Sequence, residues 1–563
     1  MTAMTEGKVK PPFSAHHREG LLQAMSQRKL DTLIIGGGIT GAGILLDAAT
    51  RGLRAGLVEM QDFASGTSSR STKLVHGGLR YLKGLELGVV AEAGKERAIV
   101  YENGPHVTSP EWMLLPLYKG GSFGKLSTSW GLRLYDWLAG VKKAERRAML
   151  NQAEVIDKEP LLKRAGLKGG GYYVEYRTDD ARLTIEVLKK AVECGGSAVN
   201  YAKAEQLLKD ETGRLIGVLV RDRVTDQTYR IEAAKVINAS GPWVDELREL
   251  DGSKAGKTLR LTKGVHLVFD GARFPLRQAC YFDTPDGRMA FAIPREGKTY
   301  FGTTDTDYRE DPVHPVMTAS DRAYLLSAAN FIFPELALRE EDVESSWAGV
   351  RPLLQQEGKA PSEVSRRDEI FVSPSGLISI AGGKLTGYRR MAQAVVDRVI
   401  KLLQEEGDVR SFQPCVTKLL PISGGETGGS DRFEAYAAAK TAEGMAHGLS
   451  EQAAAKLARR YGSNIDHVYV YRREADRWAH RFCMPTGLAL GLIYAIREEM
   501  AVRPSDFFVR RTGDLLFQID YVRKWSRPVM FAMSKELNWD GEQREAYAEE
   551  LERLLMEAVI PVG

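Results

Sequence analysis

The fold of this chain is decided by the stretch DTLIIGGGITGAGILLDAATRGLRAGLVEM, residues 31–60. Residues 33–35 form a short, continuous apolar run, which is typical of a strand buried within a parallel sheet. A glycine-rich turn follows, and then a helical pattern that ends near Gly52. A second apolar run, 55–58, ends at Glu59. This order of strand, glycine turn, helix and strand predicts a compact βαβ unit.

The glycine turn carries the spacing GxGxxG, formed by Gly36, Gly38 and Gly41. In a dinucleotide site the first glycine makes the tight turn, the second lets backbone approach the pyrophosphate, and the third lets the helix pack on the strand. The helix N-terminus then faces the phosphates. Glu59 stands where an acid accepts hydrogen bonds from the adenosine ribose, and its charge argues against NADP. The complete context therefore predicts a dinucleotide-binding site.

The fingerprint does not separate NAD from FAD, but three further stretches favour FAD. The loop ASGTSSRSTK (64–73) supplies hydroxyls and backbone amides suited to a second approach to the pyrophosphate. INASGPW (237–243) and AGGKLTGYR (381–389) each end a predicted strand in a turn of small residues. A flavin crevice needs such parts from several places in the chain.

The composition is that of a soluble globular protein whose 563 residues suggest two or three domains. A net charge of +4 gives no argument for nucleic acid. The four cysteines are far apart and form no CxxC pair, so we expect free thiols in a reducing compartment and no zinc site. Residues 1–30 show no secretory signal, and no apolar run approaches the roughly 18 residues of a membrane span. We expect a cytoplasmic protein, or at most one that is peripheral on a membrane.

The pattern along the chain divides it into four parts. We expect a polar N-terminal tail over 1–29 and an oxidoreductase region over 30–405. A linker is expected over 406–430, because PISGGETGGS at its end is rich in glycine. Beyond it the apolar periodicity is helical, which predicts an all-helical domain over 431–563.

Several motifs together resemble those of the FAD-dependent, aerobic glycerol-3-phosphate dehydrogenases. The matching pieces are DTLIIGGGITGAG (31–43), FASGTSSRSTKLVHGGLRYL (63–82), TDDARL (178–183), NASGPWVD (238–245), KGVHLV (263–268), IPREGKTYFGTTDTDY (293–308), WAGVRPL (347–353), AGGKLTGYR (381–389) and EEMAVRPSDFFVRRTG (498–513). They extend over most of the chain. The broader superfamily explains the first glycine motif, but not HGGLRYL, GVRPL and GGKLT together.

The resemblance implies a fold and a reaction. The fold is an α/β, Rossmann-like FAD-binding domain with a mixed-sheet α+β substrate domain formed by insertions, plus the C-terminal all-α domain. The FAD-binding segments are about 30–85, 180–260 and 345–405, and the substrate segments are about 86–179 and 261–344. The reaction oxidises sn-glycerol 3-phosphate to dihydroxyacetone phosphate by hydride transfer from C2 to FAD, and the electrons then pass to membrane quinone.

Two other functions remain open at this point. A glycerol-3-phosphate oxidase would share the substrate residues but pass electrons to oxygen, and a non-catalytic scaffold could keep the flavin site alone. The resemblance also leaves room for contact with the inner face of the cytoplasmic membrane and for a homo-oligomer.

The resemblance implies a set of cofactor-binding residues, with Lys73 to Gly78 along the flavin. The set is Gly36, Gly38, Gly41, Glu59, Thr67, Ser68, Ser71, Thr72, Lys73, His76, Gly77, Gly78, Ser240, Gly241, Gly383, Leu385 and Thr386.

Substrate binding is expected from the cations near the flavin. Arg80 can make a two-pronged contact with phosphate, and Tyr81 can donate to it. Lys384 could bind phosphate or the N1–C2=O edge of the flavin. Arg351 stays protonated, so it can stabilise the alkoxide that develops at C2 but cannot serve as the base.

His266 is the candidate general base, because an unperturbed histidine can take a proton at neutral pH. A core histidine is the competing interpretation, and His76 is the alternative base. In the helical domain, Arg503, Arg510 and Arg511 are expected either to face acidic lipid or a partner, or to form a solvated basic face.

Overall fold

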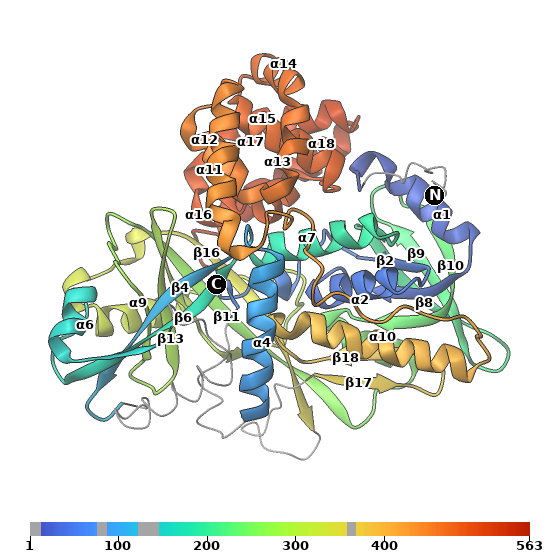
Figure 1. Cartoon of the computed structure of the whole chain (residues 1–563), viewed down its shortest axis with the longest axis horizontal. Coiled ribbons are helices and arrows are strands. Elements are labelled where there is room, and N and C mark those ends of the chain that lie inside the picture. Colours follow the sequence, from blue (N-terminus) through green and yellow to red (C-terminus); the bar gives the residue numbers. More distant parts are fainter. Residues whose placement is uncertain (1–12, 76–86, 122–145, 357–367, 563) are drawn as a thin grey trace.

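The computed structural model describes residues 13–75, 87–121, 146–356 and 368–562. Two sheets with their covering helices form the body of the molecule, and a group of helices from the C-terminal part of the chain lies over it (Figure 1). His76, Gly77, Gly78, Arg80 and Tyr81 lie outside the described residues.

The first sheet has eight strands and contains the predicted βαβ unit. Its main path runs β17-β18-β10-β1-β2-β7, and β9 and β8 extend β10 as an antiparallel meander. From β18 to β7 the strands are parallel, and β17 is antiparallel at the edge. The strands are β1 (Leu30–Ile35), β2 (Ala55–Val58), β7 (Ser197–Val199), β8 (Ala202–Lys209), β9 (Leu215–Asp222), β10 (Thr228–Asn238), β17 (Glu369–Val372) and β18 (Ile378–Ala381).

Three helices that pack against one another form a layer over this sheet, and β1 is buried at every position. Helix α2 is buried almost all round because it packs against both α7 and α10. A Cβ at Gly43 would lie 2.9 Å from the Tyr388 ring, so a glycine at this position permits the close approach of α10. The helices are α2 (Ile39–Thr50), α7 (Asp180–Glu193) and α10 (Tyr388–Glu405).

The second sheet has ten strands and is mixed. Its main path runs β15-β11-β14-β13-β12-β4-β6-β3, with β16 paired to β11 and β5 to β6. Helix α9 (Ala319–Ile332) packs on it, and a separate apolar core fills the space between them. The strands are β3 (Leu74–Val75), β4 (Thr108–Tyr118), β5 (Ala148–Leu150), β6 (Leu167–Thr178), β11 (Lys257–Asp270), β12 (Ala279–Asp283), β13 (Met289–Arg295), β14 (Lys298–Gly302), β15 (Thr306–Asp307) and β16 (Val343–Gln356).

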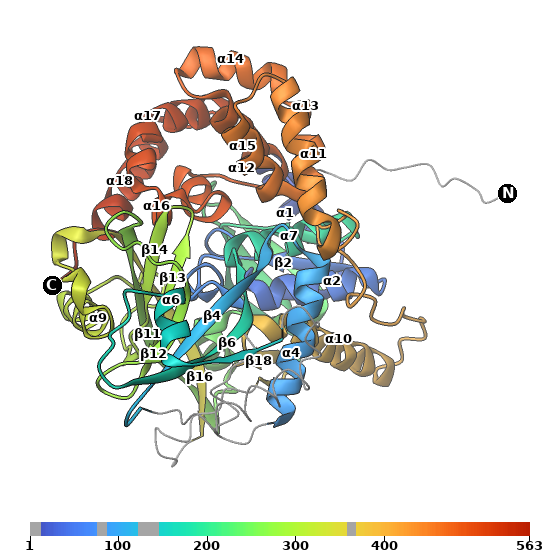
Figure 2. The same cartoon turned by 60° about the vertical axis from the view of Figure 1, so that its left-hand side comes forward.

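The C-terminal helices share an apolar core with this second sheet, and they lie over both sheets (Figure 2). Phe517 packs edge-on against Trp347 of β16, with ring centroids 5.6 Å apart. The helical region is therefore joined to the sheet by packing as well as by the chain. Its helices are α11 (Phe433–Ala446), α12 (Glu451–Tyr461), α13 (Ile465–Val470), α14 (Arg472–Phe482), α15 (Thr486–Glu498), the π-helix η11 (Asp506–Arg511), α16 (Asp514–Phe517), α17 (Ile519–Glu536) and α18 (Gly541–Glu557).

The remaining helices are shorter or lie outside these layers. They are α1 (Arg18–Gln27), α4 (Leu87–Asn103), α6 (Gln152–Lys158) and α8 (Val244–Asp251), with the short turns η1 (Ala15–His17), η2 (Thr67–Ser69), η4 (Gly241–Trp243), η5 (Pro334–Leu336), η6 (Glu340–Asp342), η8 (Leu385–Gly387), η9 (Ser430–Arg432) and η10 (Gly462–Asn464).

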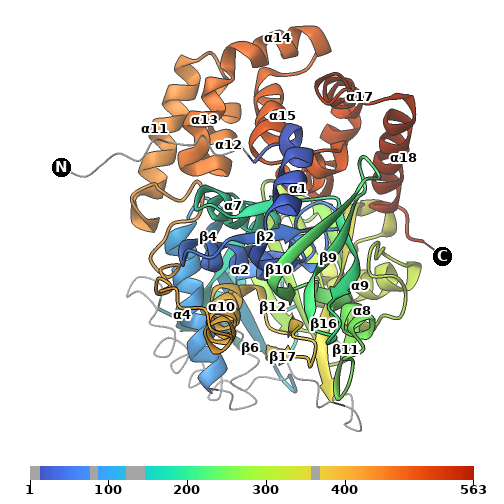
Figure 3. The same cartoon turned by 90° about the vertical axis from the view of Figure 1, so that its right-hand side faces the viewer.

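The N-terminal segment differs from the expected polar tail. Helix α1 packs on β10 (Figure 3). The short helix η1 (Ala15–His17), which directly precedes α1, contacts α15. Leu22 and Met25 are buried, and Arg18 forms a buried ion pair with Asp222 at 2.8 Å. The polar composition of 1–29 concealed a short amphipathic helix whose apolar side packs on the first sheet.

The expectation that Arg503, Arg510 and Arg511 form an exposed basic face is wrong. Arg511 is 0% exposed and Arg510 is 8% exposed. Arg503 pairs with Glu550 at 2.7 Å. These side chains point into the molecule, so they are not available to a lipid surface.

The fold class predicted from the sequence is confirmed: a Rossmann-like α/β domain, a mixed-sheet domain formed by insertions, and a C-terminal helical region. Within the described part of the chain, no helix combines the length and the apolarity that crossing a membrane requires.

Candidate active site

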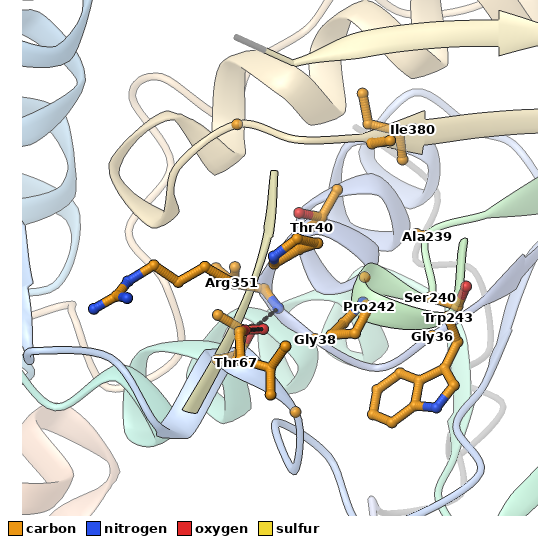
Figure 4. Close-up of a pocket in the computed structure, with 18 of the residues that line it drawn as sticks. Gly36, Gly38, Thr40, Thr67, Ala239, Ser240, Pro242, Trp243, Arg351 and Ile380 are labelled. Atoms are coloured by element: carbon orange, nitrogen blue, oxygen red, sulfur yellow. Dashed lines mark hydrogen bonds between the residues drawn. The ribbon is translucent and has the colours of Figure 1, made fainter. Parts of the chain in front are cut away.

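A cavity of about 760 Å³ lies where the two sheets meet. Its wall includes residues at the carboxyl ends of β1, β2, β10 and β18, namely Ile35, Val58, Ala239 and Ile380. Ligands of doubly wound sheets bind at this edge. The glycine turn, Thr67, the turn 240–243 and Arg351 surround one space, and Arg351 lies on the other side of it from Trp243 (Figure 4).

The glycine turn has the geometry that its spacing predicts. Gly36 has φ +115°, and a Cβ there would lie 2.5 Å from Ala239 O. A Cβ at Gly41 would lie 1.9 Å from Gly36 O, so α2 can approach the turn only without a side chain. Gly36 and Gly38 line the cavity, whereas Gly41 acts from inside the helix. The turn and the N-terminus of α2 thus present backbone to the cavity, as a pyrophosphate requires.

Glu59 ends β2 and lines the same cavity. Its Oε2 accepts from Gly37 N at 2.6 Å and its Oε1 from Gln61 N at 2.8 Å. Burial raises the pKa of this carboxyl, while the two amides oppose the rise. A carboxylate has further lone pairs, so Glu59 can still accept from a ribose hydroxyl. Its role toward ribose stays a prediction.

The hydroxyls of the 64–73 loop are largely engaged with the protein. Thr67 Oγ1 donates to Val350 O at 2.7 Å, and Ser68 Oγ accepts from Ile39 N at 2.9 Å. Ser71 Oγ donates to Asp180 at 2.7 Å. Thr67, Ser68, Ser71 and Thr72 all line the cavity. The loop therefore joins the first sheet to β16, and its side chains shape the cavity wall.

Lys73 is not among the residues that line the cavity. Its Nζ lies 2.7 Å from Asp180 Oδ1 and donates to Ser69 O at 3.0 Å, and both charged side chains are almost fully buried. The structure thus places the Lys73 side chain in an ion pair that fixes the loop to α7.

Lys73→Met should lower the free energy of unfolding by about 3–5 kcal/mol, because it leaves the buried Asp180 carboxylate without its cation. Urea unfolding of the purified protein measures this change. The double variant Lys73→Met/Asp180→Asn should recover much of the loss, since no uncompensated charge remains. A single variant within about 1 kcal/mol of the wild type, a value typical of exposed pairs, would contradict the structural role.

Two predicted cations, Arg351 and Lys384, line the cavity. Arg351 donates from Nη2 to Thr303 Oγ1 at 3.0 Å and from Nη1 to Asp305 Oδ1 at 3.2 Å. A Cβ at Gly264 would lie 2.3 Å from Arg351 Nη2, so this glycine lets the guanidinium cross β11. Lys384 begins the turn that leads into α10, directly after Gly383 with φ +81°.

His266 lies on the cavity-facing side of β11, two residues from Gly264. It is 1% exposed and stacks on Trp347, with centroids 4.6 Å apart and rings 9° from parallel. Its Nε2 lies 3.0 Å from Thr72 Oγ1. Burial, and then the charges of Arg351 and Lys73, hold the pKa of His266 well below its usual value. The ring is therefore neutral at physiological pH.

A second histidine, His106, lies away from the cavity with both ring nitrogens buried, and burial together with Arg182 lowers its pKa to about 3. In the unfolded chain both histidines titrate near 6.5. Only the unfolded state then takes up these protons as the pH falls, so stability is lost below about pH 6.5. From pH 7.5 to 5.5, His106 should lower the free energy of unfolding by about 1.4 kcal/mol. Urea unfolding at the two pH values measures this change. Between them, the free energy of unfolding of His106→Gln should fall by about 1.4 kcal/mol less than that of the wild type. Equal decreases in the two proteins would contradict the low pKa of His106.

The other predicted residues are brought together as expected. Ser240, Gly241, Gly383, Leu385 and Thr386 line the cavity. Ser240 Oγ donates to Asn238 Oδ1 at 2.6 Å, which fixes the turn after β10.

Sequence reasoning missed several lining residues, among them Arg70, Lys203 and Trp243. Trp243 belongs to the quoted turn INASGPW and Arg70 to the loop ASGTSSRSTK. Both loops were predicted to contact the cofactor, and this position could have identified the two residues as candidates. Burial and the nearby Arg510 guanidinium lower the pKa of Arg70 to about 10. No carboxylate in the described part of the chain forms an ion pair with Arg70, so it adds positive charge to the cavity wall. Lys203 lies at the start of β8, and no local sequence pattern marks it as a cavity residue.

The cavity fits an FAD molecule. Its volume lies within the roughly 300–1,000 Å³ of small-molecule and cofactor sites, and the backbone cradle at Gly36 and Gly41 would be filled by any Cβ. Arg351, Lys384 and His266 line this cavity, and so do Glu59 and Lys203.

Comparisons with known proteins support this reading of the cavity. A family model described as FAD dependent oxidoreductase matches residues 31–389, and one described as the C-terminal domain of alpha-glycerophosphate oxidase matches 415–544. The chain is 58% identical over 550 residues to the aerobic glycerol-3-phosphate dehydrogenase of Bacillus subtilis (strain 168), which covers 98% of this chain and 99% of that protein. This chain belongs to the aerobic glycerol-3-phosphate dehydrogenase family. As a member of the FAD-dependent oxidoreductases, it uses FAD as its cofactor.

Further relatives of the family agree. The aerobic glycerol-3-phosphate dehydrogenase of Staphylococcus aureus (strain USA300) is 55% identical over 547 residues, 97% of this chain and 98% of that protein. The structure of the glycerol-3-phosphate dehydrogenase from Bacillus halodurans, complexed with FAD, superimposes with a TM-score of 0.85 at 50% identity, over 98% of this chain and 99% of that chain. An L-alpha-glycerophosphate oxidase from Mycoplasma pneumoniae shares the fold, with a TM-score of 0.54 at 18% identity over 66% of this chain and 95% of that one.

Proposed function

We propose that this protein oxidises sn-glycerol 3-phosphate to dihydroxyacetone phosphate and passes the electrons to a quinone. The main support is its identity of 55–58% with aerobic glycerol-3-phosphate dehydrogenases over nearly their full length. The cavity gives independent support, because its wall combines cations suited to a phosphate with a neutral histidine suited to a hydroxyl.

The residues that would hold FAD are those at the carboxyl edge of the first sheet: the glycine turn, Glu59, Ser68 and the turns after β10 and β18. Bound FAD supplies the acceptor for the hydride that leaves C2 of the substrate. The protein's own task is then to bind the phosphate, to stabilise the developing alkoxide and to remove the hydroxyl proton.

Phosphate binding is assigned to Lys384 together with Arg80 and Tyr81, the last two on the basis of the family resemblance. Arg351 is assigned to the C2 oxygen. Its two bonds to Thr303 and Asp305 hold the guanidinium in one orientation, and the missing side chain of Gly264 leaves room for it. A fixed, charged donor of this kind stabilises negative charge that develops as the hydride leaves.

His266 is assigned as the proton acceptor. Its ring is neutral, so one nitrogen has a lone pair that can accept the hydroxyl proton, and the negative charge of a bound phosphate substrate would oppose the lowering of its pKa by burial and by Arg351 and Lys73. Of its two nitrogens, Nδ1 is fully buried, whereas Nε2 lies 3.0 Å from the hydroxyl of Thr72, which also lines the cavity. We therefore assign Nε2 as the accepting atom. The stacked Trp347 fixes the plane of the ring.

A quinone acceptor is favoured over oxygen because the most similar relatives cited above are dehydrogenases, although one family model carries the name of an oxidase. A lipid-soluble quinone would bring the protein to the inner face of the cytoplasmic membrane. Arg503, Arg510 and Arg511 cannot provide this contact, because they are buried or paired. Membrane contact and a homo-oligomer stay predictions.

A steady-state assay tests the proposal. The purified protein should reduce a quinone analogue or a redox dye with sn-glycerol 3-phosphate, and not with glycerol or an amino acid. Oxygen consumption should stay well below dye reduction. Faster reduction of oxygen than of the quinone analogue would favour an oxidase, and no turnover with any acceptor would favour a scaffold.

A further inference from the structure

The proposed reaction does not use the quoted motif EEMAVRPSDFFVRRTG, residues 498–513. This segment leads from the end of α15 through the π-helix η11. Although it belongs to the helical region, three of its charged side chains bond to residues that follow strands of the first sheet. Asp506, Arg510 and Arg511 are all buried.

The target of this segment is Asp62, which is 1% exposed. Arg511 donates from Nη1 and Nη2 to the two oxygens of Asp62 at 2.7 and 2.9 Å. Arg510 Nε donates to Asp62 Oδ2 as well, and Asn200 Nδ2 donates to Oδ1 at 2.9 Å. Four donors thus converge on one buried carboxylate, which is a strong and directional connection.

Asp62 lies in the loop 59–64, which follows β2 and contacts the glycine turn. At one end Glu59 accepts from Gly37 N, and at the other Ala64 N donates to Gly37 O at 3.0 Å. Between them, Phe63 packs so closely that a Cβ at Gly37 would lie 2.8 Å from its ring. The position of Asp62 therefore determines how the loop presents Glu59 to the cavity.

The same segment holds the neighbouring stretch 200–204. Asp506 accepts from the Tyr201 hydroxyl at 2.5 Å, and Met500 O accepts from Asn200 at 3.0 Å. This stretch is bonded to the loop 59–64 through Ala202 N and Glu59 O at 2.7 Å. Lys203 and Ala204 then line the cavity beside Glu59.

We propose that segment 498–513 of the helical region positions the adenosine end of the FAD site, and that Arg510 and Arg511 set the affinity for FAD through Asp62. The inference rests on the proposed placement of adenosine beside Glu59. These arginines are positioning residues, since they contact the loop and not the cofactor. The helical region thereby contributes to cofactor retention although it lies outside the dinucleotide fold.

The test compares Arg511→Gln, Arg511→Lys and a matched control, Arg497→Gln. Arg497 pairs with Glu474 and Glu536 wholly within the helical region. The FAD dissociation constant is measured on each apoprotein, without substrate, from the quenching of flavin fluorescence on binding. Because this measurement involves no turnover, a negative result for the positioning role can be distinguished from an error in the proposed reaction.

We expect Arg511→Gln to weaken FAD binding at least tenfold and to speed FAD release. Arg511→Lys should be intermediate, because lysine keeps the charge but loses the fork. Arg497→Gln should stay within twofold even where it lowers the melting temperature. The KM for sn-glycerol 3-phosphate, measured with saturating FAD, should not change in Arg511→Gln. An Arg511→Gln protein that melts earlier but binds FAD within twofold of the wild type would overturn the inference.

A measurement on the wild type keeps the inference testable if Arg511 variants do not fold. Coupling between the two sites is reciprocal, so FAD binding must stabilise the segment that stabilises the FAD site. Adding FAD to the wild-type apoprotein should slow amide hydrogen exchange over 500–512 at least fivefold more than over α14. Equal changes in both segments would contradict the coupling.

Discussion

Gly41→Ala should yield a protein that does not retain FAD. The added Cβ would lie 1.9 Å from Gly36 O, a backbone atom that cannot rotate away. Helix α2 would have to move from the turn, and the turn is where the pyrophosphate approaches. Overpacking usually costs about 1–3 kcal/mol, and a clash between two backbone segments belongs at the upper end or beyond. We expect FAD affinity to fall at least hundredfold.

The flavin-to-protein absorbance ratio of the purified variant measures this loss, followed by titration with added FAD. Gly20→Ala is the matched control, because nothing lies within 4 Å of a Cβ at that position in α1. Alanine favours a helix over glycine by about 1 kcal/mol, so the control should bind FAD normally. A Gly41→Ala protein with a full complement of FAD would show that the turn does not form the cradle described.

Arg351→Met should lower kcat/KM by about 10²–10³, the effect of removing a fixed donor that faces developing negative charge. The flavin content should stay normal, since Arg351 belongs to β16 and the backbone cradle of the cofactor is untouched. The kcat/KM of Arg351→Lys should lie between those of the wild type and Arg351→Met, because a lysine keeps the charge but cannot bond to Thr303 and Asp305 with two separate nitrogens. Steady-state kinetics with a redox dye gives the values.

The control for Arg351 is Arg260→Met. Arg260 lies on the neighbouring strand β11 and forms its ion pair with Asp307. It does not line the cavity, so kcat/KM should stay within about twofold, as expected for an exposed ion pair of small energy. If Arg351→Met kept kcat/KM within threefold of the wild type, Arg351 could not be the group that stabilises the alkoxide.

The parts of the site that the sequence predicted are those built from local chain geometry. GxGxxG needs only neighbouring residues to form its turn, and the GGKLT turn leads directly from β18 to α10. The placement of His266 and Arg351 on one face needed more than local pattern. It follows from the register of β11 and β16, which pairs His266 with Trp347 and Thr262 with Arg351.

The sequence was least informative where a charge has a distant partner. Arg510 and Arg511 are adjacent basic residues in a polar context, which resembles a surface patch, but their partner Asp62 stands 448 and 449 positions earlier. Lys73 likewise pairs with Asp180, 107 positions away. No periodicity or local composition indicates such pairs, because they depend on how domains pack. The helix α1 was missed for a related reason: its polar residues outnumber the few apolar ones that are buried.

The central claim is that one cavity binds FAD and oxidises sn-glycerol 3-phosphate there. An anaerobic absorbance spectrum, recorded before and after addition of this substrate, tests it most directly. We expect flavin bands that bleach with sn-glycerol 3-phosphate and persist with glycerol or an amino acid. Bands that persist with sn-glycerol 3-phosphate would contradict the substrate, and a protein that shows no flavin bands even after incubation with FAD would contradict the cofactor site itself.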